Sequence, residues 1–367
     1  MFTLRTVAPV VLVVALLCSC GGGARTEQIE VPRRDDQPYG GGETAAVAEP
    51  SVLSLRTIAL PGGPGPVRMD FIAYDPASHA LWVPAGNTGR VDVIDVATDS
   101  VSTIEGFVTS EIDTPRGRRV VGPSSVVLGQ GVAYVGNRGD SSVCAIDTHA
   151  RTVAGCVHLE SMPDAMILVP SRGELWVTTP RARSIVVLRV AGTTATPSIV
   201  ETIPFDGEPE CFALDAEHGV VFTNLEDQDR TLAIDASSRH VLSTWEPGCG
   251  EAGPRGLAFD GARRLVYVAC TDHLATLDID HAGAIVSTLA TGGGVDDVTF
   301  VASRSLLYVG SGADALLRVV RVGEDGSLRV LATAATSTGA RNAVVDEAGR
   351  AYLTDSEGAR IFAVQSP

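Results

Sequence analysis

The chain has 367 residues, of which 45% are apolar but only 5% aromatic, so Val, Leu, Ile and Ala must form most of its core. Its 28 basic residues, all arginine, stand against 44 acidic residues and give a net charge of −16. This balance disfavours nucleic-acid binding, because a phosphate backbone attracts a surplus of positive charge. The lack of lysine in the sequence also excludes Schiff-base chemistry and a P-loop.

The first twenty residues are typical of an export signal. Arg5 precedes the apolar stretch "VAPVVLVVALL", which is too short to predict a membrane span and leads into "LCSC", Leu17–Cys20. The segment resembles a bacterial lipoprotein signal peptide over 1–19, and this resemblance implies that Cys20 becomes the lipidated N-terminus. The alternative is an ordinary secretory signal in which both cysteines are incidental.

Residues 20–50 predict a lipidated, disordered tether, because they are rich in Gly, Pro and charge and have no apolar period. Gly21 stands where the inner-membrane retention signal of lipoproteins has Asp, which favours the outer membrane in a host with two membranes. We therefore expect residues 51–367 to be anchored at the cell envelope, on its periplasmic or surface side, by acyl chains on Cys20.

From residue 52 onward apolar residues recur with period two, and one strand-like run appears seven times. Most spacings between these runs are about 43 residues; the first apolar positions are Val91, Val143, Ile185, Thr231, Leu274, Leu317 and Ile361. Two shorter strand-like segments precede each run, and a fourth segment follows six of them. Four antiparallel strands per repeat form a propeller blade. The sequence thus predicts an all-β, seven-bladed β-propeller, rather than a sandwich.

The seventh repeat lacks a fourth strand, because the chain stops at Pro367. The segment "SLRTIALPGG", residues 54–63, has the fourth-strand pattern but no blade before it. An open ring would expose two unpaired strand edges. We therefore expect this N-terminal strand to close the ring by pairing with residues 360–365 in the last blade.

"YVGN" at 134–137, followed by "SVCAID" and with degenerate copies elsewhere, resembles the repeat of the YVTN propellers, relatives of the lactonase-like seven-bladed group. The resemblance covers about residues 52–367. Two copies depart from it, since Arg189 and Arg321 replace the Asp that ends the repeated strand. The family hosts binding proteins, surface proteins and a few enzymes, so the fold does not fix the function.

In such rings the first strand of every blade lines the central channel and begins at one face, here called the top face. Polar residues occupy these starts: Asp70, Ser124, Asp164, Glu210, Arg255, Asp296 and Arg341, followed by Ser125, Cys211, Asp297 and Asn342. This pattern predicts a mouth that binds a polar ligand or a cation. The alternative is a hydrated mouth whose charges pair with one another.

The connection over 106–123, between the first and second blades, is unusually long and contains Arg116, Arg118 and Arg119. We expect Arg138 to lie near it on the top face. Insertions on a fixed face often carry recognition, and a local arginine patch on an acidic protein would receive an acidic group. The alternative is a solvated loop with scattered charge.

The histidines do not predict a metal site. Five of them fall in connections on the opposite face, and only His158 and His273 are expected near the top face. No metal, no cofactor and no catalytic residue is predicted, and no base is visible beside a cysteine.

Export permits disulfides. Cys144 and Cys156 lie on neighbouring strands of one hairpin and should face each other, unless both are small buried hydrophobic residues. Cys249 could reach either Cys270 or Cys211.

Together these features favour a monomeric, non-enzymatic binding or scaffold module that presents its top face to an envelope protein or a small polar ligand. Whether it is an enzyme stays open. The alternative is a lactonase-like hydrolase with its site in the propeller mouth, where Asp164, Glu210 and Arg255 would be the base and oxyanion candidates.

Overall fold

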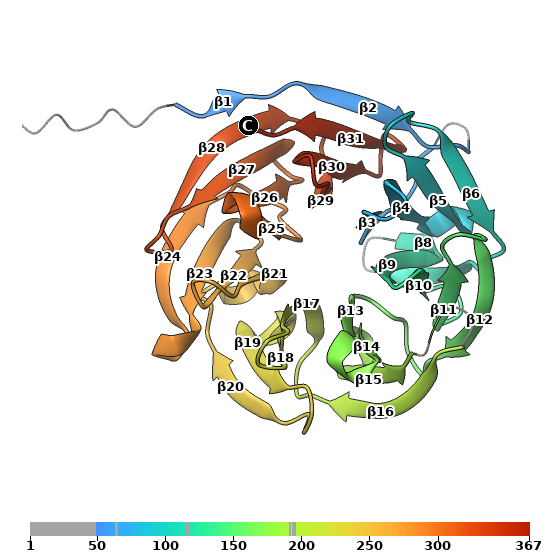
Figure 1. Ribbon diagram of the computed structural model, residues 1–367, viewed down its shortest axis with the longest axis horizontal. Coiled ribbons are helices and arrows are strands. Elements are labelled where there is room, and N and C mark those ends of the chain that lie inside the picture. The colour runs from blue at the N-terminus through green and yellow to red at the C-terminus, as the bar shows by residue number, and fades with distance from the viewer. Residues whose placement is uncertain (1–48, 63–64, 115–116, 191, 193–195) are drawn as a thin grey trace, which may run out of the picture. The chain divides into compact units, whose positions relative to one another are not determined.

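The computed structural model describes residues 49–62, 65–114, 117–190, 192 and 196–367. Over this part of the chain, seven sheets of four antiparallel strands form a ring, which confirms the predicted seven-bladed β-propeller (Figure 1). The predicted signal peptide, the lipidation site Cys20 and nearly all of the tether lie outside the described residues. None of the helices that the structure describes has the length and apolar character needed to cross a membrane.

Each blade runs from an innermost strand at the channel to an outermost strand at the rim (Figure 1). Blade 1 contains β3 (Ala73–Asp75), β4 (Ala80–Ala85), β5 (Arg90–Asp95) and β6 (Val101–Glu105). Blade 2 contains β9 (Pro123–Gly129), β10 (Val132–Asn137), β11 (Ser142–Asp147) and β12 (Thr152–His158). Blade 3 contains β13 (Met166–Val169), β14 (Glu174–Thr179), β15 (Ser184–Arg189) and β16 (Ser198–Pro204). Blade 4 contains β17 (Pro209–Asp215), β18 (Val220–Leu225), β19 (Arg230–Asp235) and β20 (Val241–Trp245).

The remaining blades follow the same order. Blade 5 contains β21 (Pro254–Asp260), β22 (Leu265–Cys270), β23 (His273–Asp278) and β24 (Ala284–Ala290). Blade 6 contains β25 (Thr299–Val301), β26 (Leu306–Ser311), β27 (Leu316–Val322) and β28 (Leu328–Ala335), with β1 (Ser51–Val52) added at its outer edge. Blade 7 contains β29 (Arg341–Val345), β30 (Arg350–Asp355), β31 (Arg360–Gln365) and β2 (Leu55–Ala59). Outside the blades, β7 (Ser110–Thr114) pairs with β8 (Gly117–Val121).

The helices of the described residues are short 3₁₀ turns in the connections. They are η1 (Gly86–Thr88), η2 (Pro170–Arg172), η3 (Pro180–Ala182), η4 (Glu226–Gln228), η5 (Gly250–Ala252), η6 (Ile279–His281) and η7 (Ala302–Arg304).

The core of the propeller lies between adjacent blades. All six residues of β4, β10 and β22 are buried, whereas most of β12 and β16 is exposed at the rim. Trp82, for example, packs with Val135 of the next blade. Because the middle strands are covered on both faces, their sequences are nearly continuous apolar runs, and burial of these runs drives the blades together.

The ring closes where the sequence predicts. β2 pairs antiparallel with β31, with Leu55 opposite Val364, and Ile58 is 3% exposed in the core shared by blades 7 and 1. β1 was not predicted; it pairs in parallel with β28 of blade 6. The chain therefore runs along the outside of two blades before it enters the ring, as the blue segment in Figure 1 shows.

The turn after the third strand explains the repeated Asp and its replacement by arginine in two blades. The carboxylate of Asp95 accepts hydrogen bonds from the backbone amides two and three residues later, at 2.9 and 3.0 Å. The same arrangement recurs at Asp147, Asp235 and Asp278. In the two departing blades, Arg189 and Arg321 instead donate to a main-chain carbonyl of the preceding turn. The arginines thus satisfy acceptors rather than donors.

Candidate functional site

One small cavity at the mouth of the channel is lined by a charged side chain from each of the seven blades. The cavity has a volume of about 160 Å³, and Phe71 and Cys211 complete its wall. We call it the inner cavity; its charged residues are Asp70, Arg138, Asp164, Glu210, Arg255, Asp296 and Arg341. Seven of the candidate binding residues named from the sequence are therefore neighbours in space. Six of them occupy the equivalent position near the first strand of their blades, which the repeat places around one axis, whereas Arg138 reaches the cavity from the turn between β10 and β11.

Arg138 joins three blades. It lies in the turn between β10 and β11, where one of its terminal nitrogens is 2.9 Å from Asp70 Oδ2 and also contacts Asp164 Oδ1. Its side chain is only 19% exposed. A guanidinium presents several donors in a fixed plane, so it can serve two carboxylates from different blades at once.

Two further ion pairs connect neighbouring blades. Arg341 Nη1 of blade 7 lies 3.4 Å from Asp296 Oδ2 of blade 6. Arg255 of blade 5 pairs with Glu226, the first residue of η4 in blade 4. Glu226 was missed from the sequence, although it directly follows β18 in a second-to-third-strand connection, and those connections share the top face.

The side chain of Asn342 forms hydrogen bonds to two carboxylates of the mouth. Its φ of 56° lies in the left-handed region that Asn tolerates better than most residues. In this conformation its side-chain amide donates to Asp70 Oδ1 at 3.0 Å and to Asp296 Oδ2 at 3.3 Å. The side chain therefore links blade 7 to blades 1 and 6.

Acidic groups outnumber arginines in the inner cavity, and several carboxyl groups stay protonated to unusually high pH. Burial raises the pKa of Asp164 to about 6, although Arg138 opposes this effect. Burial also raises the pKa of Glu210 well above its usual value, with a contribution from Asp164 and from a hydrogen bond to Glu226. Burial likewise raises the pKa of Asp297 to about 7. The mouth can therefore hold or exchange protons near neutral pH.

A larger cavity of about 400 Å³ adjoins the inner one and shares Asp70, Arg138 and Arg341 with it. We call it the outer cavity. Two further arginines, Arg68 before β3 and Arg119 on β8, belong to its wall, as does Ser124 of β9. The inner cavity is thus dominated by carboxylates, and the outer cavity by guanidinium groups.

The insertion over 106–123 is a hairpin rather than a plain loop, and this decides which of its arginines face the mouth. Successive side chains of a strand point to opposite sides. Arg119 of β8 lines the outer cavity, whereas Arg118 is 68% exposed and pairs with Glu111 and Asp113 of β7, at 3.3 and 3.6 Å. The structure therefore does not bring Arg118 to the mouth. Arg116 lies outside the described residues.

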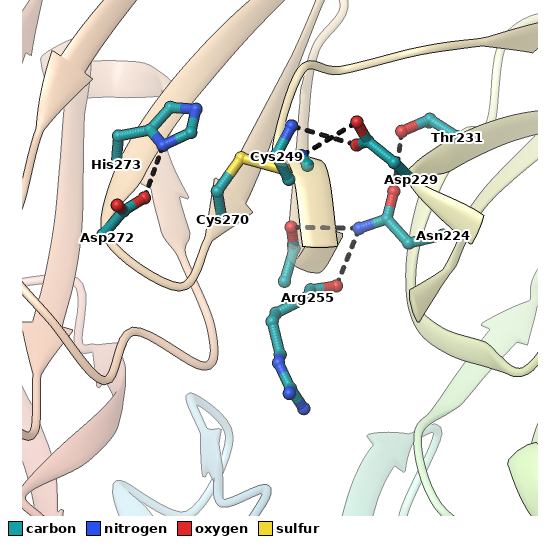
Figure 2. Close-up of a disulfide and its surroundings, with 10 residues drawn as sticks. Asn224, Asp229, Thr231, Cys249, Arg255, Cys270, Asp272 and His273 are labelled. Atoms are coloured by element: carbon teal, nitrogen blue, oxygen red, sulfur yellow. Dashed lines mark hydrogen bonds and ion pairs between the residues drawn. A yellow bond between two sulfur atoms is a disulfide. The ribbon is translucent and has the colours of Figure 1, made fainter. Parts of the chain in front are cut away.

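A disulfide holds the loop that leads to Arg255 (Figure 2). Cys249 and Cys270 are bonded, and the backbone amide of Cys249 donates to the Asp229 carboxylate at 2.9 Å. On the other side, the amide group of Asn224 donates to the main-chain carbonyl of Arg255 at 2.7 Å. The main chain that carries Arg255 is therefore fixed while its side chain points away from the disulfide (Figure 2).

The predicted bridge between Cys144 and Cys156 also forms, between residues directly opposite each other in β11 and β12. Cys211 is buried and is the free cysteine of the described residues, so Cys249 pairs with Cys270 and not with Cys211. Two disulfides are typical of proteins that fold outside the reducing cytoplasm.

Within the described residues, no group of three or more His, Cys, Asp and Glu side chains is arranged to hold a metal ion. The two histidines expected near the top face have local partners: His158 lies 3.2 Å from the main-chain oxygen of Asp140, and His273 lies 2.6 Å from Asp272 Oδ1. The groups that line the mouth are carboxyls, guanidiniums, one amide, hydroxyls and the buried thiol of Cys211.

The fold and this mouth define the class of the molecule, a seven-bladed β-propeller. No protein-family model matches the chain, and no curated protein matches it in sequence. Among solved structures, it is similar to a chain of the mitotic checkpoint complex (12% identity, TM-score 0.71, covering 94% of this chain and 99% of that one). It is also similar to streptogramin B lyase (11% identity, TM-score 0.66, covering 85% of this chain and 97% of that one). A third similar structure is that of U3-55K (11% identity, TM-score 0.68, covering 85% of this chain and 98% of that one). At these identities the similarity shows a shared fold.

Proposed function

We propose that this chain is a lipid-anchored β-propeller of the cell envelope that binds a small polar ligand in the mouth of its top face. The observation that carries the proposal is the convergence of one charged side chain from each blade on a single cavity. In small-molecule sites, convergent polar groups fix the orientation of the ligand. A ligand there would exchange hydrogen bonds with groups that already lie in a largely preformed arrangement, so little reorganisation is needed.

The binding proposal is tested by thermal unfolding of the purified chain in the presence of a panel of sugars, amino acids and organic acids. A ligand that fills the mouth raises Tm, because it binds only the folded state. Asp164→Asn should abolish that increase, whereas Asp113→Asn should retain it, since Asp113 is 92% exposed on the outer hairpin. A panel in which no compound raises Tm would speak against a small-molecule mouth and favour an envelope protein as the partner.

Anchoring at the envelope rests on the Leu17–Cys20 motif and on the resemblance to YVTN-repeat propellers, and the two disulfides support export. Metabolic labelling with a radioactive fatty acid tests it. Cys20→Ala should lose the label and leave the membrane fraction, while Cys18→Ala should keep both. Labelling that persists in Cys20→Ala would refute the anchor.

The second candidate is a lactonase-like hydrolase, and the raised pKa values of Asp164 and Glu210, in a cavity that also contains three arginines, favour it. A carboxylate with a pKa of about 6 would accept a proton from water above that pH, and Arg255 would stabilise a developing oxyanion. Streptogramin B lyase has the same architecture, so the ring accommodates an enzyme in that protein. Hydrolysis of a lactone series with a rate that rises through pH 6, and is lost in Asp164→Asn, would select this function. A ligand bound without turnover would select binding.

A further inference from the structure

The outer cavity differs from the inner one in the sign of its charge, and this difference identifies the class of ligand. Of the four arginines on its wall, Arg138 and Arg341 are paired with carboxylates of the inner cavity. Arg68 and Arg119 form no ion pair with any carboxylate within the described residues. Two unneutralised guanidinium groups therefore border one cavity of a protein whose net charge is −16.

Arg119 is the more confined of the two. Its Nε–H is buried and has no hydrogen-bond partner among the described residues, although buried donors are nearly always paired. Burial lowers the pKa of Arg119, and the positive charges of Arg138, Arg68 and Arg181 lower it further, whereas the Asp70 carboxylate opposes them. The wall of the outer cavity thus holds several like charges close together. A bound anion offsets their repulsion.

The surroundings give an anion access and leave space for the rest of a molecule. The volume of about 400 Å³ falls within the range of small-molecule sites. Gly294, Gly312 and Gly339 form part of the wall, and a Cβ on Gly339 would meet no atom within 4 Å. The outer cavity has two carboxylates in its wall, Asp70, which also lines the inner cavity, and Glu357, which is exposed.

We propose, on the basis of the mouth-binding function above, that the ligand is a small organic anion. Its carboxylate or phosphate group binds Arg119 and Arg68 in the outer cavity, and its hydroxyl or ammonium donors face Asp164 and Asp296 of the inner cavity. Arg119 supplies the charge recognition, and the hairpin β7–β8 exists at this face to position it. A neutral molecule of the same shape leaves the guanidinium groups unpaired and binds more weakly.

Isothermal calorimetry on the full chain tests this with two matched pairs of probes, galacturonate against galactose and alanylalanine against its C-terminal amide. The first pair supplies hydroxyl donors and the second an ammonium group. Comparing the two pairs therefore shows which kind of donor the carboxylates of the inner cavity prefer. The anionic member of at least one pair should bind about tenfold or more tightly than its neutral partner. Arg119→Gln should remove that preference, and Arg119→Lys should restore part of it.

Arg118→Gln is the matched control, because Arg118 is the adjacent residue of β8, is 68% exposed and points away from the cavity. It should leave the preference unchanged. Without ligand, the Tm of Arg119→Gln should equal or exceed that of the wild type, since the substitution removes repulsion. A lower ligand-free Tm would assign Arg119 a structural role and overturn the inference, as would equal affinities within both pairs or no binding of either anion. Binding of galactose that depends on Asp164 but not on Arg119 would overturn the inference that the ligand is an anion. The proposed function, binding of a small polar ligand in the mouth, would still hold.

Discussion

The carboxyl group of Asp297 should make the propeller less stable as the pH rises, and Asp297→Asn should remove this effect. Asp297 follows Asp296 at the start of blade 6 and packs against the backbone of blade 5, where a Cβ on Gly256 would lie 2.5 Å from the Asp297 Cα. Oδ1 accepts a hydrogen bond from the backbone amide of Val298, which an Asn side chain of equal size can also do. The substitution therefore removes a charge and little else.

The magnitude follows from the pKa. In the folded chain the pKa of Asp297 rises from 3.8 to about 7, so the folded state binds more protons than the unfolded state between these two values. Stability is then greatest at low pH and falls as the pH rises through 7. One pKa unit corresponds to about 1.4 kcal/mol, so the full destabilisation above pH 7 is about 4 kcal/mol, and about 3 kcal/mol of it develops between pH 5 and pH 8.

Urea unfolding at pH 5 and pH 8, followed by the fluorescence of the buried residues Trp82 and Trp176, measures this change. The stability of Asp297→Asn relative to the wild type should increase by about 3 kcal/mol from pH 5 to pH 8, at constant m-value. Asp113→Asn, at a 92% exposed side chain, should show no such increase. An Asp297→Asn variant that is destabilised equally at both pH values would show that this carboxyl is charged in the fold and would refute the reasoning.

Three further substitutions test the ring itself. Ile58→Ala, in the closing strand, should lower the free energy of unfolding by about 2–5 kcal/mol, measured by urea denaturation, since the side chain is 3% exposed; a loss below 1 kcal/mol would show that β2 contributes little. Glu174→Gln should lower it by about 2 kcal/mol, because the fully buried Glu174 carboxylate accepts from Arg172 and Arg239 at 3.2 and 3.0 Å and a neutral amide weakens these charge-assisted bonds; an unchanged Tm would contradict this. Cys249→Ser should lower it by about 3 kcal/mol in oxidising buffer, from the 21-residue separation of the bridge, and by far less in reducing buffer; an equal loss in both buffers would attribute the effect to packing.

The repeat made the fold and much of the mouth predictable. A period shared by seven segments specifies both the number of blades and which positions are equivalent, and equivalent positions around an axis must lie near one another. That is why the sequence alone predicts that Asp70, Asp164 and Arg341, which are far apart in the chain, lie at one end of the channel. Ring closure was predictable for a similar reason. The segment 54–63 has the fourth-strand pattern but no blade before it, and the seventh repeat is the one that lacks a fourth strand.

Features that depend on particular side chains rather than on the period were not predictable. β1 comprises two residues and has no pattern of its own. The hairpin β7–β8 carries polar residues on both sides, so apolar and polar residues do not alternate clearly enough to predict its strands. The opposite directions of Arg118 and Arg119 follow only once β8 is known to be a strand. The ion pair of Glu226 with Arg255 required the distance between two neighbouring blades.

The pairing of β2 with β31 also has a consequence for biogenesis. The two strands meet from positions about 300 residues apart, and bringing the ends of such a segment together costs about 5 kcal/mol in chain entropy. During synthesis β2 is made before the blades and has no hydrogen-bonding neighbour until β31 of the last blade follows. In that interval Ile58 is an apolar residue on an unpaired edge, so the incomplete propeller is prone to association with other chains until its final strand is in place.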